Sequence, residues 1–394
     1  MYFNYKITKL PNHQIPMSSY DAIVLGIGGM GSAALWHLSR RGAAVLGLEQ
    51  FGIAHDRGSS HGGSRLIRRA YFEHPDYVPL VSRAYELWSE LEQASGRKLF
   101  HRTGLYMAGP PEGLLVSGVL RAARAHNLDI EKVAGTDAAD RFPGLRATPD
   151  MITLYEADAG FLEVENCVRT HIEQAQAAGA ETRFGVKVHG WTANESGVQV
   201  ETDAGRFSAS QLLVCGGAWS AGLLTDLASS LQIRRKVVVW YQTTGKGYRV
   251  DNGCPVFCFD TSEGFFYGFP SFDGQTVKVG EHSGGQDIER PESLHRELAS
   301  GDLPPLERFI AAHLPLATRQ VVEHSVCMYT MSPDEHFVID RHPRYDNVIV
   351  ACGFSGHGFK FASAIGSVLA DLVLAGRTNE PVGFLGLKRL RAFH

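Results

Sequence analysis

A thiol and a phenol stand two residues apart near the end of the chain, at Cys327 and Tyr329. Further along, an apolar run over 348–352 breaks into the segment 353–360, which contains three glycines and ends at Lys360. Glycines let a backbone approach a ligand closely, and the start of a helix offers unpaired N–H groups and the positive end of a dipole. A lysine in the first helical turn adds a positive charge. This segment is therefore predicted to hold an anionic group.

The beginning of the chain contains a second glycine-rich turn. An apolar strand over 20–25 precedes Gly26, Gly28 and Gly31, and a helical pattern and a second apolar strand then lead to Glu49. In such a unit the first glycine permits a tight turn, the second lets the backbone approach a pyrophosphate, and the third allows close packing of helix on strand. The acid after the second strand can hydrogen-bond a ribose. The pattern predicts a βαβ dinucleotide-binding unit.

Composition narrows the class of protein. The chain has 394 residues, 44% hydrophobic and 20% charged, with a formal net charge of −4. These values are typical of a globular α/β enzyme with room for two domains. We expect no nucleic-acid partner because no basic stripe is present, and no membrane partner because no apolar window reaches about eighteen residues. The six cysteines lack metal-ligand spacing, which predicts no metal site and favours free thiols in a reducing cytoplasm.

The periodicity of apolar residues changes along the chain. Helical spacing is found over 80–91 and 163–178, whereas short strands and turns occupy 182–215 and 232–285. A strand over 347–352 and a helix over 359–375 then return to the α/β style. The predicted fold is α/β, with a segmented Rossmann-like nucleotide-binding domain interleaved with an antiparallel β-sheet substrate domain.

The two predicted domains are both discontinuous, and an irregular extension over 1–17 precedes them. The nucleotide-binding domain is expected to comprise 18–100, 158–229 and 324–394. The substrate domain is expected to comprise 101–157 and 230–323.

Four segments in this order resemble the family of monomeric sarcosine oxidase and N-methyltryptophan oxidase. They are the glycine turn with Glu49, then 58–68, then 327–330, and finally 353–360. The resemblance covers the chain from Tyr20 to about residue 376. It implies that the dinucleotide is FAD and that a thioether at Cys327 holds the flavin covalently, which fixes its geometry and shifts its potential.

The resemblance also implies which residues contact the cofactor. These residues are Gly26, Gly28, Gly31, Glu49, Ser59, His61, Arg65, Val188, Gly217, Cys327, Gly356, Gly358 and Lys360.

The family's substrates carry a carboxylate, and Arg68 and Lys360 match its carboxylate-binding pair. A guanidinium offers a planar bidentate fork and an ammonium adds a point charge. Lys278 matches the lysine that promotes the reaction with oxygen, although its alternating strand taken alone predicts an exposed lysine. Tyr71 and Glu73 lie on a segment expected to cap the pocket. The remaining matches imply catalytic roles for Arg65, His282 and Tyr329, and substrate contacts for Tyr267, Tyr71 and Cys258.

The size of the substrate stays open at this stage. Cys258 stands where sarcosine oxidases carry a methionine. The segment 237–242 resembles the N-methyltryptophan branch of the family, whereas 327–330 resembles the sarcosine branch.

The implied reaction is the oxidation of an N-methyl amino acid by hydride transfer to flavin. Dioxygen is reduced to hydrogen peroxide, and the imine hydrolyses to formaldehyde and an amino acid. Three alternatives remain: an oxidase of cyclic imino acids, opines or fructosyl amino acids, a dehydrogenase that passes electrons to a quinone or carrier, and a flavin-binding protein without catalysis. A cytoplasmic monomer is expected.

Overall fold

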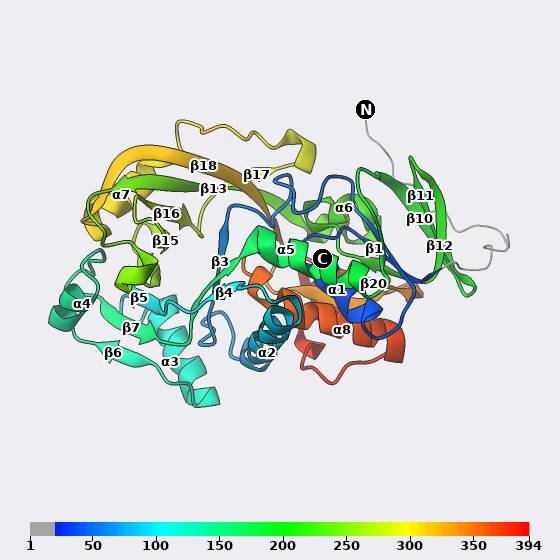
Figure 1. Ribbon diagram of the computed structural model, residues 1–394, viewed down its shortest axis with the longest axis horizontal. Helices are drawn as coiled ribbons and strands as arrows, with labels where there is room; N and C mark the ends of the chain where they lie inside the picture. Colours follow the sequence, from blue (N-terminus) through cyan, green and yellow to red (C-terminus); the bar gives the residue numbers. More distant parts are fainter. Residues whose placement is uncertain (1–19, 394) are drawn as a thin grey trace.

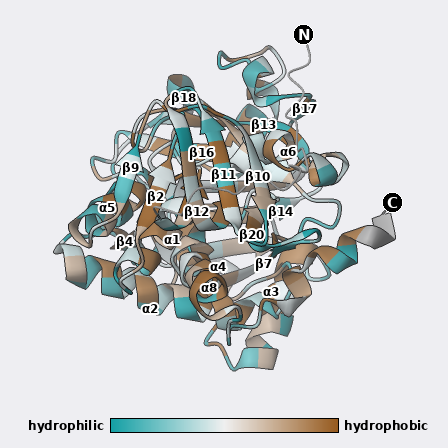
Figure 2. Cartoon of the chain, turned by 90° about the vertical axis from the view of Figure 1, so that its right-hand side faces the viewer, coloured by the Kyte–Doolittle hydropathy of each residue, from teal (hydrophilic) through white to brown (hydrophobic). Residues whose placement is uncertain are grey.

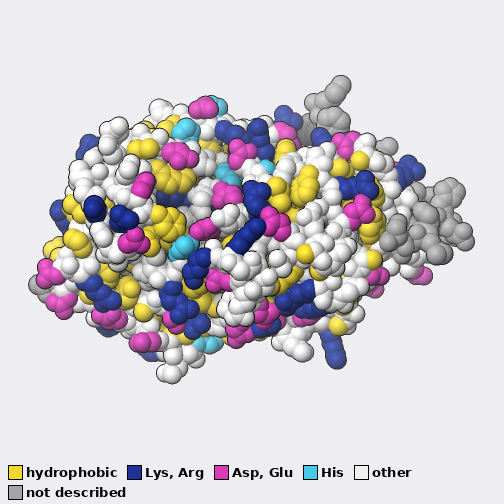
Figure 3. Space-filling view, in the orientation of Figure 1, with side chains coloured by type: hydrophobic (Ala, Val, Ile, Leu, Met, Phe, Trp, Pro, Cys, Tyr) yellow, Lys and Arg dark blue, Asp and Glu magenta, His cyan; other side chains and the backbone are white. Residues whose placement is uncertain are grey.

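Two large β-sheets, one toward each side of the view in Figure 1, organise the computed structural model, which describes residues 20–393. The extension predicted over 1–17 lies outside these residues. Among the described residues, no helix has the length and apolar character needed to cross a membrane. Figure 3 shows acidic and basic side chains interspersed on one face of the molecule.

The first sheet has a parallel centre made of segments that are far apart in the sequence. Its strands lie in the order β20 (Tyr345–Cys352), β12 (Gly205–Val214), β1 (Tyr20–Leu25), β2 (Val45–Leu48) and β9 (Glu181–Arg183). Strands β10 (Val188–Asn194), β11 (Gly197–Thr202) and β19 (Val338–His342) extend the sheet by antiparallel pairing. Parallel strands covered on both faces require nearly continuous apolar runs, and β1 and β20 have them.

Four helices pack together against this sheet. α1 (Gly29–Ser39) lies between α5 (Val164–Ala177) and α8 (Ala362–Ala375), and α2 (Tyr77–Ser95) packs on α8. Figure 2 shows α8 as mostly hydrophobic and α2 as mixed, as expected when an inner helix is covered by an amphipathic one. The α/β fold with interleaved segments is thus confirmed.

The second sheet is mainly antiparallel. Its order is β17 (Gln286–Ile288), β13 (Gln232–Thr243), β16 (Thr276–Glu281), β15 (Gly264–Phe269), β14 (Val256–Thr261), β5 (Leu105–Gly109), β7 (Ile152–Glu156) and β6 (Glu131–Val133). The pair β14–β5 is parallel. The helices α3 (Leu114–His126), α4 (Gly135–Arg141) and α7 (Leu303–His313) pack on it.

The long strand β18 (Ala317–Met331) pairs with β13 along nearly its whole length. The domain boundary expected at residue 324 falls inside this strand, and Cys327 is therefore part of the second sheet. The other domain boundaries stay predictions.

A small sheet of β3 (Ser64–Ile67), β8 (Gly160–Glu163) and β4 (Phe100–His101) lies between the two large ones. Arg65 is on β3 and Arg68 directly follows it. The small sheet thus brings two cations to the region between the large sheets.

Candidate active site

An extended cavity is lined by residues from all three sheets. Its wall contains the glycine turn after β1, the end of β2, the loop before β3, side chains along β14 and β15, the end of β18 and the loop 353–360. The two glycine-rich segments singled out in the sequence therefore face one cavity, although more than three hundred residues separate them.

The turn after β1 has the geometry of a dinucleotide cradle. Gly26 has a φ of +80°, and a Cβ there would lie 2.7 Å from the carbonyl oxygen of Cys215. A Cβ on Gly31 would lie only 1.9 Å from the oxygen of Gly26, so this glycine permits helix α1 to start directly against the turn. Gly28 faces the cavity, where the nearest atom to an added Cβ is Ser60 Oγ at 3.7 Å. Backbone N–H groups at a helix start in this setting fit a pyrophosphate.

Glu49, at the end of β2, is held by the same turn. Its Oε2 accepts a hydrogen bond from the N–H of Ile27 at 3.2 Å, and its Oε1 accepts one from Phe51 at 3.1 Å. The carboxylate lines the cavity and has further lone pairs for a ribose hydroxyl. The glycine turn and this acid fit FAD.

Other predicted cofactor residues also lie in the wall of the cavity. They are Ser59, His61, Arg65, Val188, Gly217, Cys327, Gly356, Gly358 and Lys360. Gly31 packs beneath the turn instead of lining the cavity.

The loop 353–358 is pressed against the end of β18. Gly356 has a φ of +80°, and a Cβ there would lie 2.2 Å from the ring of Tyr329. The N–H of Ser355 donates to the oxygen of Thr330 at 2.9 Å. A Cβ on Gly358 would lie 2.6 Å from Phe354. These contacts keep Cys327 and the glycine loop on neighbouring parts of the wall.

The basic loop before β3 is held by hydrogen bonds at both sides. Arg65 donates to the oxygens of Ser59 at 2.8 Å and Ser64 at 2.9 Å. The ring of His61 contacts the Gly58 oxygen at 3.0 Å, and burial lowers the pKa of His61 to about 4. We therefore expect a neutral imidazole at this position.

Arg68 is 2% exposed in the wall of the cavity, and its guanidinium already makes hydrogen bonds within the protein. Nη1 donates to the oxygen of Ala70 at 2.7 Å and Nη2 to Glu73 Oε2 at 2.6 Å. Its Nε is buried without a hydrogen-bond partner in the described part of the chain. Burial alone would raise the pKa of Glu73, but Arg68, His357 and Lys360 lower it to about 2. The carboxylate is therefore ionised at neutral pH.

Lys360 is the second cation of the predicted pair. Its Nζ donates to the oxygen of His357 at 2.7 Å. Burial, together with the charge of Arg68, lowers the pKa of Lys360 to about 7. The ammonium is thus only partly populated at neutral pH, and a bound carboxylate would favour it.

The other predicted polar residues also face the cavity. Burial lowers the pKa of His282 to about 4, so its imidazole is neutral at physiological pH. Burial raises the pKa of both Tyr267 and Tyr329, and the phenols stay protonated. Cys258 completes this part of the wall as a small side chain.

Besides Gly31, two further predicted residues do not line the cavity. Tyr71 is fully buried and its hydroxyl is hydrogen-bonded to Nδ1 of His357, and its expected substrate contact stays a prediction. Lys278 is only 3% exposed because both faces of β16 are covered, and the exposed lysine expected from alternation is wrong.

Lys278 lies behind the turn 62–64. Its Nζ donates to the oxygen of Gly62 at 2.6 Å and to the oxygen and Oγ of Ser64 at 3.1 Å. The ring centroids of Phe269 and Trp240 lie 4.6 and 5.2 Å from the ammonium. Burial holds its pKa well below the usual range.

Two residues of the site were missed in the sequence. Lys236 pairs across the strands with Cys327, and its Nζ donates to the oxygens of His282 and Gly284 at 3.1 and 3.2 Å. Glu165 accepts hydrogen bonds from the N–H groups of the positive-φ turn at Gly62 and Gly63. A lysine inside a strand carries no periodic signal, and an acid in a first helical turn is commonplace.

Known proteins resemble this chain over most of its length. The model of the FAD dependent oxidoreductase family matches residues 21–372. The chain is 43% identical to a monomeric sarcosine oxidase of Streptomyces avermitilis, over 95% of this chain and 98% of that protein. It is 36% identical to an N-methyl-L-tryptophan oxidase of Salmonella dublin, over 92% of this chain and 96% of that protein.

The chain belongs to the FAD-dependent oxidoreductase family. The resemblance to sarcosine and N-methyltryptophan oxidases stated from four segments is confirmed over most of the chain. Among solved structures, NikD, an amino acid oxidase, is similar with a TM-score of 0.82, 24% identity and coverage of 94% and 97% of the two chains. An L-proline dehydrogenase of P. horikoshii has a TM-score of 0.82 at 20% identity, covering 96% of this chain and all of that one. These two likenesses show the fold.

Gly28 and Gly31, two of the three glycines of the cradle, are expected to differ in the effect of an alanine substitution. Gly31→Ala places a Cβ against the backbone oxygen of Gly26. We therefore expect its unfolding free energy to fall by about 2–4 kcal/mol. Gly28→Ala meets only open cavity, so its stability without cofactor should match that of the parent, while its affinity for added FAD falls. Urea unfolding and FAD titration measure both, on cofactor-free chains that also carry Cys327→Ser so that FAD binds reversibly. Equal stability of the two variants would contradict the close approach at Gly31.

Proposed function

We propose that the chain is an FAD-dependent oxidase of N-methyl amino acids. The observation that carries this proposal is the buried cation pair Arg68 and Lys360, which lines the same cavity as the FAD cradle. Glu73 neutralises only one of the two buried cations, so the pair can accept one further anion, and the relatives' names give amino acids of this type as their substrates.

Each residue near the cation pair has a defined task in this proposal. The substrate carboxylate binds the guanidinium of Arg68 and the ammonium of Lys360, which both line the cavity. The nearby positive charges lower the pKa of the substrate's amine, and the reaction requires the unprotonated amine because its lone pair forms the C=N bond. Neutral His282 and the protonated phenol of Tyr267 orient the substrate without competing for its charge.

Bound FAD supplies the hydride acceptor, and dioxygen is the proposed final electron acceptor. Water hydrolyses the imine product, which releases formaldehyde when the N-methyl group has been oxidised. Orientation of the carboxylate by the two cations is the chain's main contribution.

The decisive experiment is anaerobic mixing of the purified protein with candidate substrates while the flavin absorbance is recorded. Sarcosine or N-methyltryptophan should bleach the flavin, and subsequent air should restore it with release of peroxide. Bleaching by proline or pipecolate alone would favour a cyclic imino acid as substrate. A protein that no secondary amine bleaches would overturn the proposal.

We also propose that Cys327 forms a thioether with the flavin, because its thiol lines the cavity on β18 beside the glycine loop. Cys327→Ser should release yellow flavin on acid precipitation, whereas the parent protein keeps it in the pellet. Cys254→Ser, another buried thiol, is the matched control and should behave like the parent. Flavin that stays in the pellet of Cys327→Ser would place the linkage elsewhere.

Lys278 is proposed to supply the positive charge that favours reduction of dioxygen, because it is a cation buried next to the loop that lines the cavity. Lys278→Met should slow reoxidation in air by orders of magnitude and leave anaerobic reduction by substrate nearly unchanged. Stopped-flow absorbance separates the two half-reactions. Lys236→Met, which removes another buried ammonium of the same sheet, should cause no selective loss of the oxygen reaction. Equal slowing of both half-reactions in Lys278→Met would count against the role.

A monomeric, cytoplasmic enzyme completes the proposal. None of the six cysteines, all of which lie in the described part of the chain, forms a disulfide, which suits a reducing compartment. Sedimentation of the purified holoenzyme measures its oligomeric state.

A further inference from the structure

The ring of Tyr71 contacts both cations of the proposed carboxylate site. The Cζ atom of Arg68 lies 4.4 Å from the ring centroid, and the Nζ atom of Lys360 lies 5.2 Å from it. The ring is fully buried and does not line the cavity. Cation–π attraction is strongest when the charges are removed from water, and one ring attracts two groups that repel each other. The contact therefore offsets part of the cost of holding two positive charges together.

The orientation of this ring is set by a histidine. The hydroxyl of Tyr71 is bonded to Nδ1 of His357, and Nε2 of the same imidazole contacts the oxygen of Glu335 at 3.0 Å. A carbonyl oxygen only accepts, so Nε2 carries the hydrogen and Nδ1 accepts from the phenol. Burial lowers the pKa of His357 to about 3, which keeps the imidazole neutral and this single tautomer in place.

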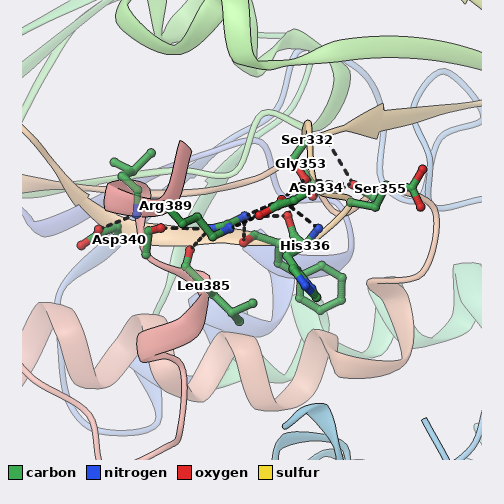
Figure 4. A network of polar contacts seen from close by, with 12 residues as sticks. Ser332, Asp334, His336, Asp340, Gly353, Ser355, Leu385 and Arg389 are labelled. Atoms are coloured by element: carbon green, nitrogen blue, oxygen red, sulfur yellow. Dashed lines mark hydrogen bonds and ion pairs between the residues drawn. The ribbon is translucent and has the colours of Figure 1, made fainter. Parts of the chain in front are cut away.

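Arg389, in the C-terminal segment, holds the turn that carries Glu335 (Figure 4). Nε of Arg389 donates to Asp334 Oδ2 at 2.7 Å, and Nη2 donates to the oxygens of His336 and Phe337 at 2.8 and 2.7 Å. The guanidinium thereby closes the turn 332–337.

The same turn also contacts the glycine loop directly. The N–H of Ser332 donates to Ser355 Oγ at 3.2 Å, and Ser332 Oγ donates to the His336 oxygen at 2.6 Å. The turn 332–337 is thus joined to the loop 353–360 at Ser355 and at His357, on either side of Gly356.

We infer that Tyr71 is a positioning residue for Arg68 and Lys360, oriented by His357 and held from behind, through the turn 332–337, by Arg389. The inference rests on the proposed function, in which these two cations bind the substrate carboxylate. It assigns the C-terminal segment a part in substrate affinity although Arg389 does not line the cavity.

The test compares two probes that differ only in charge. 2-Furoate carries a carboxylate and cannot be oxidised as an amine, whereas 2-furamide has the same shape without the charge. Binding of each to the holoenzyme is measured from the change in flavin absorbance, and the flavin content of every variant is determined separately. The ratio of the two affinities reports the cation pair alone, because a general loosening of the cavity weakens both probes alike.

Tyr71→Leu removes the ring. It should lower the affinity for 2-furoate by about tenfold or more, while the affinity for 2-furamide changes little. Tyr71→Phe keeps the ring and loses only the bond to His357, so the loss should be smaller. Tyr85→Leu is the matched control: Tyr85 is another buried tyrosine, with the Cζ of Arg69 4.5 Å from its ring centroid, and its removal should leave the ratio unchanged.

Arg389→Met tests the remote part of the inference, with its exposed neighbour Lys388→Met as control. We expect a lower 2-furoate to 2-furamide affinity ratio in Arg389→Met and the parent ratio in Lys388→Met. If Arg389→Met does not fold, the Tyr71→Phe and Tyr71→Leu pair still decides the role of the ring.

The outcomes separate this inference from the proposed function. A parent protein that binds no 2-furoate contradicts the carboxylate site itself. If the parent binds 2-furoate but the Tyr71 variants keep the parent's affinity ratio, or lose affinity for both probes equally, the positioning role is overturned. The carboxylate site itself then stands. An Arg389→Met variant with the parent ratio removes the C-terminal segment from the inference.

Discussion

The burial of positive charge between the two large sheets is the constraint on which the site depends. Arg68, Lys236, Lys278 and Lys360 are each almost fully buried. A buried cation is costly unless acceptors surround it, and here backbone carbonyl oxygens provide many of them. The same hydrogen bonds hold the loops that carry those carbonyls. Charge and loop geometry therefore stabilise each other.

Strand order explains how these loops meet. β1, β12 and β20 come from three distant parts of the chain and lie side by side in parallel, so the turns after them lie at one edge of the sheet. The second sheet contributes β18, which brings Cys327 to the same cavity. The small sheet adds Arg65 and Arg68. No single segment forms the site, and backbone hydrogen bonds join its loops to one another.

The oppositely charged residue inside this wall is also informative. Glu73 accepts a hydrogen bond from Nη2 of Arg68. It stays ionised because Arg68, His357 and Lys360 lower its pKa. Together with neutral His282 and His357, it limits the net positive charge of the cavity. Glu73 thus offsets one of the two positive charges of Arg68 and Lys360.

Much of this protein was determined by the sequence itself. The spacing of Gly26, Gly28 and Gly31 before Glu49 predicts the cradle, because the tight turn and the helix start are local backbone requirements, although the carbonyl oxygen of the distant Cys215 also excludes a Cβ at Gly26. The apolar runs of β1 and β20 predict buried strands for the same reason. Only the tertiary structure decided which side chains are buried and which residues surround them. Lys278 is buried because a second layer covers β16, Tyr71 lies behind the cavity because His357 and both cations surround its ring, and Lys236 reaches the site only through pairing of β13 with β18. These contacts join residues far apart in the chain, and no local pattern encodes them.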